Sequence, residues 1–144
     1  MTETRRIDVN MPSAHARSLG IEVTGWEDGK LYLKLPYAEH LVGDPDTGII
    51  HGGVITAALD NASGYCIRIR PDFEEGQTMA TLDLRIDYMR GAEPNRDLTI
   101  MAECFKMTKN IAFVRGTAWD DSPDDPVATS TAAFMMGTPG EPRA

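Results

Sequence analysis

The spacing of hydrophobic and polar positions changes along the chain, and the changes predict where strands and helices lie. Apolar and polar residues alternate around residues 21–23 and 31–35. Asp28-Gly29 separates these two runs, and Asp-Gly is typical of tight hairpins, so we predict a β-hairpin. From residue 51 to about 69 the apolar residues recur at steps of three and four, which predicts a long and largely buried helix.

Alternation with a period of two returns after this helix, in four stretches at residues 78–90, 97–107, 110–120 and 127–136. Turn-rich pieces connect them, so we predict four consecutive antiparallel strands that form a meander. A hairpin, one long helix and a meander together make an α+β fold. The sheet must wrap around the helix, because no other element is long enough to cover its apolar surface.

The chain is expected to form one domain with short flanking segments. Its predicted parts are an N-terminal segment at 1–19, a domain at 20–137 and a disordered tail at 138–144. Within the first part we predict a short helix near 12–19, which Pro12 and Ser13 open and Gly20 closes. Residues 38–50 are rich in glycine, proline and acids, and we expect them to form a loop that leads into the long helix.

The charge balance and the cysteines of the chain limit the kinds of partner and the cellular compartment that we expect. The chain has 14 Lys and Arg against 22 Asp and Glu, a net charge of −8, and no cluster of basic residues. This argues against nucleic acids and anionic membranes as main partners. Cys66 and Cys104 fit neither a metal-ligand spacing nor a disulfide framework, and the first twenty residues lack the apolar stretch of a signal peptide, so we expect a cytoplasmic protein without a metal.

The long helix contains a carboxylate that needs an explanation. Asp60 ends the stretch HGGVITAALD, and a buried, unpaired carboxylate costs several kcal/mol, so such a residue is usually paired or part of a site. Helical spacing places Asp60 on a narrow stripe of polar and small residues with Thr56, Ser63 and Gly64. We expect this stripe to face something other than the hydrophobic core.

The start of the same helix is a candidate binding site. His51-Gly52-Gly53 would present free backbone N–H groups at the positive end of the helix dipole, where anions or a developing oxyanion bind. Asp60 lies eight residues beyond Gly52, which is about 12 Å along a helix axis. The two cannot meet within one helix, but an antiparallel second copy would bring Asp60 of one chain to Gly52 of the other. The sequence therefore suggests a two-fold dimer with composite sites.

Three quoted stretches carry a family resemblance. GDPDTGIIHGGVITAALDNASGYC, followed by TLDLRIDYMR and KNIAFVRGTAWD, resembles the hotdog-fold acyl-CoA thioesterases of the phenylacetate-degradation (PaaI-like) branch over about residues 20–136. The most specific features are His-Gly-Gly with Asp nine positions after the His, and the pattern Thr-x-Asp-Leu-x-x-x-Tyr-Met-Arg. The resemblance implies a long helix wrapped by an antiparallel sheet, homodimers or tetramers, and hydrolysis of acyl-CoA without a metal or redox cofactor.

The resemblance also implies roles for individual residues. Asp60 matches the family's general base or nucleophile, and Gly52 matches the residue whose N–H polarises the thioester carbonyl. His51 matches the residue that caps or orients the start of the helix. Thr81 takes the place of a hydroxyl residue, commonly Ser, and would help to hold the water.

One position departs from the family pattern. Where the family often has Asn-Pro shortly before the His, this chain has Asp44-Pro45, with Asp46 close behind, and an ionised carboxylate cannot donate a hydrogen bond as Asn does. A net acidic protein also needs local positive charge to bind the phosphates of coenzyme A. The candidate substrate-binding residues are Gly53, Asp44, Asp46, Arg90, Lys109 and Asn110.

Several alternatives stay open at this level. Asp60 could act as a nucleophile or as a general base, or it could be a structural acid, and His51 could be a cap or take a direct part in catalysis. A non-catalytic acyl-CoA binding or sensing domain would keep the groove but lack the acid, so Asp60 speaks against it. A hydratase or dehydratase would need an Asp-His pair at the acyl chain, and here the His precedes the glycine pair.

Overall fold

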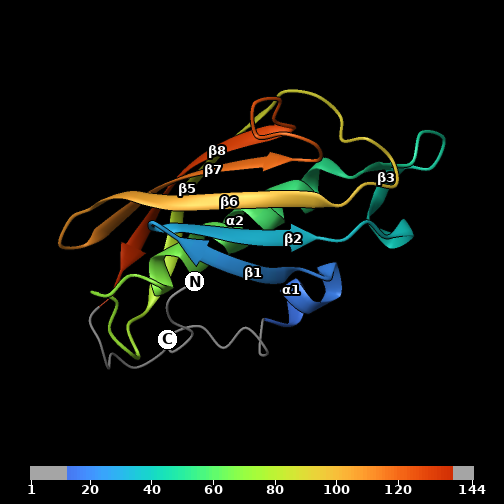
Figure 1. The fold of residues 1–144 in the computed structure, drawn as a ribbon. Coiled ribbons are helices and arrows are strands. Elements are labelled where there is room, and N and C mark those ends of the chain that lie inside the picture. The colour runs from blue at the N-terminus through green and yellow to red at the C-terminus, as the bar shows by residue number, and fades with distance from the viewer. Residues whose placement is uncertain (1–12, 138–144) are drawn as a thin grey trace.

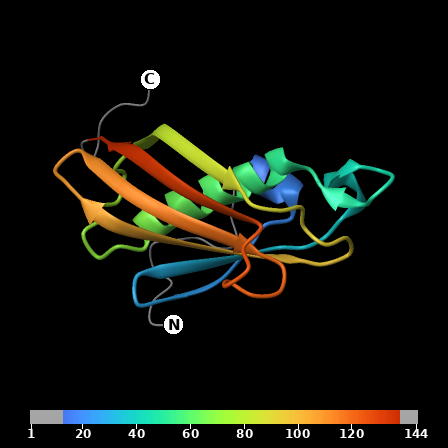
Figure 2. The same ribbon diagram turned by 90° about the horizontal axis from the view of Figure 1, so that it is seen from above.

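The computed structural model describes residues 13–137, and the predictions for 1–12 and for the tail at 138–144 lie outside this range. The elements are α1 (Ala14–Leu19), β1 (Glu22–Glu27), β2 (Lys30–Leu35), the 3-10 helix η1 (Glu39–Leu41), β3 (Val42–Asp44), β4 (Ile49–Ile50), α2 (Gly52–Arg68), β5 (Met79–Tyr88), β6 (Leu98–Met107), β7 (Ile111–Trp119) and β8 (Ala128–Met136). Figures 1 and 2 show the large sheet curving around α2. The expected fold, an antiparallel sheet wrapped around one long helix, is confirmed.

Local signals in the sequence explain the first elements. Asp28 and Gly29 both have positive φ, at 53° and 76°, which is the backbone that a two-residue hairpin turn requires. The predicted β1–β2 hairpin is therefore confirmed. The Ser13 side chain accepts a hydrogen bond from the Ala16 N–H, and Gly20 closes α1 in the left-handed conformation, as the sequence predicts.

The core lies between α2 and the concave face of the sheet. One face of the helix is buried, and it packs against β2, β5, β6, β7 and β8. The buried residues of α2 are Ile55, Ala58, Leu59, Ala62, Ser63, Cys66 and Ile67. Across from them, alternate residues of the strands are inaccessible to solvent, such as Leu31, Leu33 and Leu35 of β2. In the described part of the chain, no helix is long and apolar enough to cross a membrane.

The predicted four-strand meander is wrong for its first strand. The sheet has the order β1-β2-β6-β7-β8-β5, so β5 pairs with β8 and only β6, β7 and β8 follow one another. Alternation specifies which face of a strand is buried, but it does not specify which strand lies beside it. After α2 the chain enters the sheet at the edge opposite β1. As a result β5 is an edge strand.

The segment at 38–50 is also more regular than predicted. It contains η1 and a small separate hairpin, β3–β4, in which Val42 pairs with Ile50. The turn-forming residues occupy only the tip, where the N–H groups of Thr47 and Gly48 donate to the Asp44 carbonyl. The residues on either side of the tip are free to pair, and for this reason the loop prediction is wrong there.

Candidate active site

His51 caps the start of α2. Its Nδ1 accepts a hydrogen bond from the Gly53 N–H at 2.8 Å, so the neutral ring carries its proton on Nε2. Two glycines leave room for this ring, because a Cβ on Gly43 would lie 2.9 Å from the His51 Cα and a Cβ on Gly53 would lie 2.9 Å from Nδ1. The structure thus has His51 in the capping position, and it gives Gly53 a steric reason to be glycine.

One backbone N–H at the start of α2, that of Gly52, has no acceptor among residues 13–137. The Gly53 N–H is bound by His51 Nδ1, and the Val54 N–H donates to the His51 carbonyl at 3.0 Å. Within residues 13–137, no acceptor faces the N–H of Gly52. This free donor stands at the positive end of the dipole of a 17-residue helix. Such a group can hydrogen-bond to a carbonyl oxygen and to the oxyanion that forms from it.

Tyr88, at the end of β5, lies against the same turn of α2. Its hydroxyl donates to the Gly52 carbonyl at 3.0 Å and also contacts the hydroxyl of Thr56. Sequence analysis assigned Tyr88 no role of its own. The motif Thr-x-Asp-Leu-x-x-x-Tyr-Met-Arg contains it, and this was the only signal in the sequence.

Asp60 meets Thr81 of β5. The Thr81 hydroxyl donates to Oδ1 of Asp60 at 3.0 Å, while Oδ2 has no partner among the residues that the structure describes. Asp60 is half-buried and Thr81 is exposed. The carboxylate is therefore held in one orientation, and its second oxygen is free to accept a proton or to attack a carbonyl carbon.

The polar stripe of α2 is shorter than the sequence predicts. Ser63 is completely buried and donates to the Leu59 carbonyl at 2.7 Å, so its placement on a stripe away from the core is wrong. A short hydroxyl side chain can satisfy itself on the preceding helical turn, and for this reason it is tolerated in the core. Thr56, Asp60 and Gly64 are half-buried and remain outside the core.

Within one chain the structure brings Asp60 to Thr81 but not to Gly52. Asp60 and Gly52 lie on the same continuous helix, so about 12 Å of axial rise separates them. The chain thus carries a held carboxylate at one position and a free N–H donor at another.

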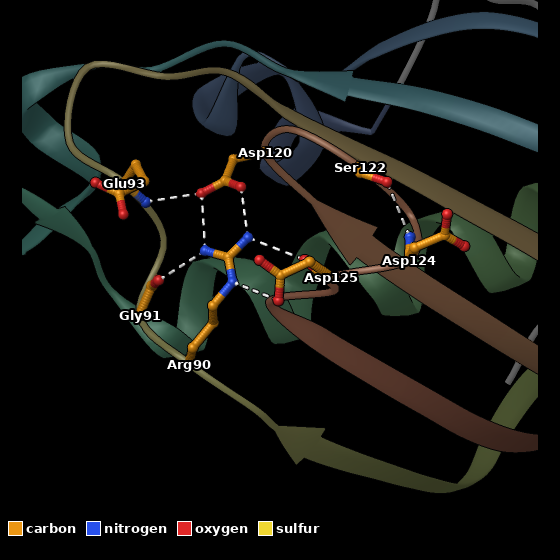
Figure 3. A network of polar contacts seen from close by, with 7 residues as sticks. All are labelled: Arg90, Gly91, Glu93, Asp120, Ser122, Asp124 and Asp125. Carbon is orange, nitrogen blue, oxygen red and sulfur yellow. Dashed lines mark hydrogen bonds and ion pairs between the residues drawn. The ribbon is translucent and has the colours of Figure 1, made fainter.

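Arg90 has protein partners for its guanidinium, as Figure 3 shows. It donates to both oxygens of Asp120 at 3.0 and 2.6 Å and to the Gly91 carbonyl, and it forms an ion pair with Asp125 at 3.3 Å. The Asp120 side chain is only 1% exposed and also accepts from the Glu93 N–H. The hydrogen bonds from Arg90 hold the pKa of Asp120 well below its usual range. Arg90 therefore joins the loops after β5 and β7, and this geometry does not favour a phosphate-binding role.

The other predicted binding residues lie at opposite ends of the molecule. Lys109 and Asn110 are exposed in the β6–β7 turn, where the Asn110 carbonyl accepts from a backbone N–H of β8 at 2.7 Å. Asp44 and Asp46 are exposed in the β3–β4 turn, where an Asp44 carboxylate oxygen accepts from the Asp46 N–H at 3.0 Å. Figures 1 and 2 show the two turns at opposite ends of the sheet, so within one protomer these residues form no common cluster.

Metal and thiol chemistry receive no support from the side chains. Among residues 13–137, no group of three or more His, Cys, Asp or Glu side chains could hold a metal ion. Cys66 is buried, and burial raises the pKa of its thiol. A thiol that stays protonated is a poor nucleophile, so Cys66 is a core residue, as the sequence predicts.

Comparison with known proteins gives consistent results. The family model for the thioesterase superfamily matches residues 47–127. The medium/long-chain acyl-CoA thioesterase YigI of Salmonella typhimurium is 30% identical over 132 residues, which cover 84% of each chain. A protein of Halobacterium salinarum named as an esterase is 35% identical over 75 residues, 51% of this chain and 50% of that one.

Solved structures agree with this result. The structure of a phenylacetic acid degradation-related protein from Ralstonia eutropha superposes with a TM-score of 0.74 at 25% identity, and the match covers 86% of this chain and 91% of that one. The family match includes the helix that carries the free N–H donor and the strand whose hydroxyl holds the carboxylate. The chain belongs to the thioesterase superfamily, and the protein is a thioester hydrolase with the hotdog fold.

Proposed function

We propose that the enzyme hydrolyses acyl-CoA thioesters to the free acid and CoA, with Asp60 as general base or nucleophile and the Gly52 N–H as the donor to the carbonyl. The observation that carries the proposal is the half-buried Asp60 carboxylate, with one oxygen bound by Thr81 and the other free. The YigI relative, named a medium/long-chain acyl-CoA thioesterase, supports CoA esters of medium and long acids as first substrates to test.

Two routes are compatible with this geometry. As a nucleophile, Asp60 attacks the carbonyl carbon, CoA leaves as the thiolate, and water then hydrolyses the mixed anhydride. As a general base, Asp60 takes a proton from a water molecule that attacks the same carbon, and the tetrahedral intermediate expels the thiolate, which takes up the proton. In both routes the negative charge that develops on the carbonyl oxygen is stabilised by the Gly52 N–H.

We further propose that the enzyme is a homodimer, alone or within a tetramer, with two composite sites. The separation of Asp60 from Gly52 on one helix supports this, because neither residue completes a site within its own chain. The half-buried face of α2 is free of bulky side chains at Ala57 and Gly64, which would allow a second helix to approach. Strand β5 offers ten residues of sheet edge, and its Leu82 is 54% exposed.

Mixed dimers test the composite site. An Asp60→Ala chain and a Gly52→Val chain are each expected to be inactive as homodimers. Equal mixing yields half heterodimers, each with one intact site of two, so activity recovers to about a quarter of the wild-type value. Exchange of subunits is verified by native mass spectrometry. If exchange is complete and no activity returns, the two residues do not act across an interface.

The substrate class is tested by release of free thiol from CoA esters of short, medium and long straight-chain acids and of an aryl acid. Turnover of at least one acyl-CoA, lost in the Asp60 variant, is the expected result. Membership in the thioesterase superfamily favours hydrolysis over a non-catalytic binding domain and over hydration. A protein that binds acyl-CoA tightly but releases no thiol from any ester would contradict the proposal.

We propose the cytoplasm as the compartment. Cys66 and Cys104 are both free thiols in the structure. Unpaired cysteines are typical of proteins in reducing compartments.

A further inference from the structure

We propose that Tyr88 is a positioning residue of the hydrolytic site, whose hydroxyl fixes the first peptide units of α2 so that the Gly52 N–H stays aimed at the thioester carbonyl. The inference rests on the proposed function, which gives the Gly52 N–H its role. Tyr88 itself touches neither the reacting carbon nor the attacking oxygen in this account, and it acts through Gly52.

The peptide unit that joins Gly52 to Gly53 is held at both ends. Its carbonyl oxygen accepts from the Tyr88 hydroxyl at 3.0 Å, and the Thr56 hydroxyl, which contacts the Tyr88 hydroxyl, lies 3.3 Å from the same oxygen. Its N–H donates to Nδ1 of His51 at 2.8 Å. Side chains from α2, from β5 and from the residue that caps α2 therefore surround one peptide plane.

The preceding peptide unit, which joins His51 to Gly52, is held only through its carbonyl. That oxygen accepts from the Val54 N–H at 3.0 Å, and the His51 N–H is bound in turn by the Leu41 carbonyl at 2.8 Å. Because the planes on both sides of Gly52 are fixed, both backbone torsions of this glycine are fixed too. Glycine otherwise has the widest conformational freedom of any residue, so the direction of its free N–H depends on these contacts.

The Tyr88 ring also lies so close to Gly52 that a side chain at position 52 would crowd it. A Cβ on Gly52 would lie 3.3 Å from Cε1 of the Tyr88 ring, closer than ordinary packing allows. Tyr88 is 53% exposed in a single chain, so the core of that chain does not bury its ring. The polar contacts of this side chain are those of its hydroxyl with the Gly52 carbonyl and with Thr56, both in the first turn of α2.

Tyr88→Phe removes the hydroxyl and keeps the ring. We expect kcat for a medium-chain acyl-CoA to fall roughly tenfold, less than the loss of an oxyanion donor itself, with KM within about twofold and an unchanged melting temperature. Tyr32→Phe is the matched control, because Tyr32 lies on β2 and its hydroxyl has no hydrogen-bond partner within residues 13–137. We expect the Tyr32 variant to keep wild-type kcat.

A spectroscopic probe separates positioning from packing. In a ketone analogue of the substrate, a methylene between sulfur and carbonyl prevents hydrolysis, and the infrared carbonyl band moves to lower frequency when an N–H donates to it. Bound to the wild type the band should shift down, and bound to Tyr88→Phe it should shift less and become broader. An equal shift in both proteins, or equal kcat, would overturn the inference about Tyr88. No shift in the wild type would instead count against the proposed role of Gly52, so the two failures are distinguishable.

Discussion

Replacing Asp60 with asparagine separates a catalytic carboxylate from a structural one. The amide has nearly the same shape, and its oxygen can accept the Thr81 hydrogen bond that Oδ1 accepts now at 3.0 Å. The amide nitrogen at the position of Oδ2 can neither take a proton from water nor attack a carbonyl. We therefore expect turnover to fall by 10²-fold or more, about 3 kcal/mol in the activation barrier.

The same contacts limit the effect on folding. Asp60 is half-buried, the Thr81 bond is kept, and Oδ2 has no partner to lose within the described residues. The free energy of unfolding should therefore change by less than about 1 kcal/mol. A purely structural acid predicts the reverse pattern, in which stability falls and turnover per folded molecule stays near its wild-type value.

The assay measures thiol release and the melting temperature on one preparation of each variant. Asp83→Asn is the matched control, since it neutralises an exposed carboxylate on the same strand as Thr81, and it should leave turnover unchanged. A stably folded Asp60→Asn enzyme with near-normal hydrolysis would refute the assignment of Asp60.

Three further predictions follow from other contacts. In Gly116→Ala the new Cβ would lie 2.5 Å from the buried Ser130 Oγ, so urea denaturation should show a free energy of unfolding lower by about 2 kcal/mol. A further Ser130→Gly change should restore part of this loss, and an unchanged denaturation midpoint in Gly116→Ala would contradict the prediction. The lowered pKa of Asp120 means that its pairing with Arg90 stabilises the fold fully above the unfolded pKa of about 4, and that this stabilisation decreases progressively as pH falls from there through the lower pKa of the folded state. Asp120→Asn should thus melt below the wild type at pH 7, with the gap beginning to narrow as pH falls below about 4, and a gap that stays constant down to the most acidic pH at which the protein folds would argue against the ion pair. If the exposed Lys109 meets the phosphates of CoA, calorimetry should show weaker CoA binding in Lys109→Ala and in high salt; binding insensitive to both would remove it from the site.

Local patterns predict the elements of this fold better than their arrangement. Spacing at three and four residues specifies α2, and Asp28-Gly29 specifies the first hairpin, because both depend on residues close in the chain. The place of β5 depends instead on how the whole sheet closes around the helix. A strand that alternates correctly can pair with either neighbour, so the sequence alone did not distinguish β6 from β8 as its partner.

In the candidate site, too, local sequence indicates some residues, and others become apparent only from the structure. Asp60 stands out because a carboxylate on an apolar helix needs a reason, and Gly52 stands out by its place at the helix start. The partner of Arg90 could not be predicted, since Asp120 lies thirty residues away in another loop. Tyr88 was missed because its partner is also distant in the sequence, and only the structure shows that its hydroxyl reaches the carbonyl of Gly52.

One strand connects the two halves of the proposed site. Strand β5 hydrogen-bonds to α2 at two places, through Thr81 at the carboxylate of Asp60 and through Tyr88 at the carbonyl of Gly52. The same strand is an edge of the sheet, so the backbone available for pairing with a second copy belongs to the residues that orient the acid and the donor. In the proposed dimer, association therefore completes each site and also stiffens the strand that holds both of its parts. In this proposal an isolated protomer would lack the partner residue and this support together.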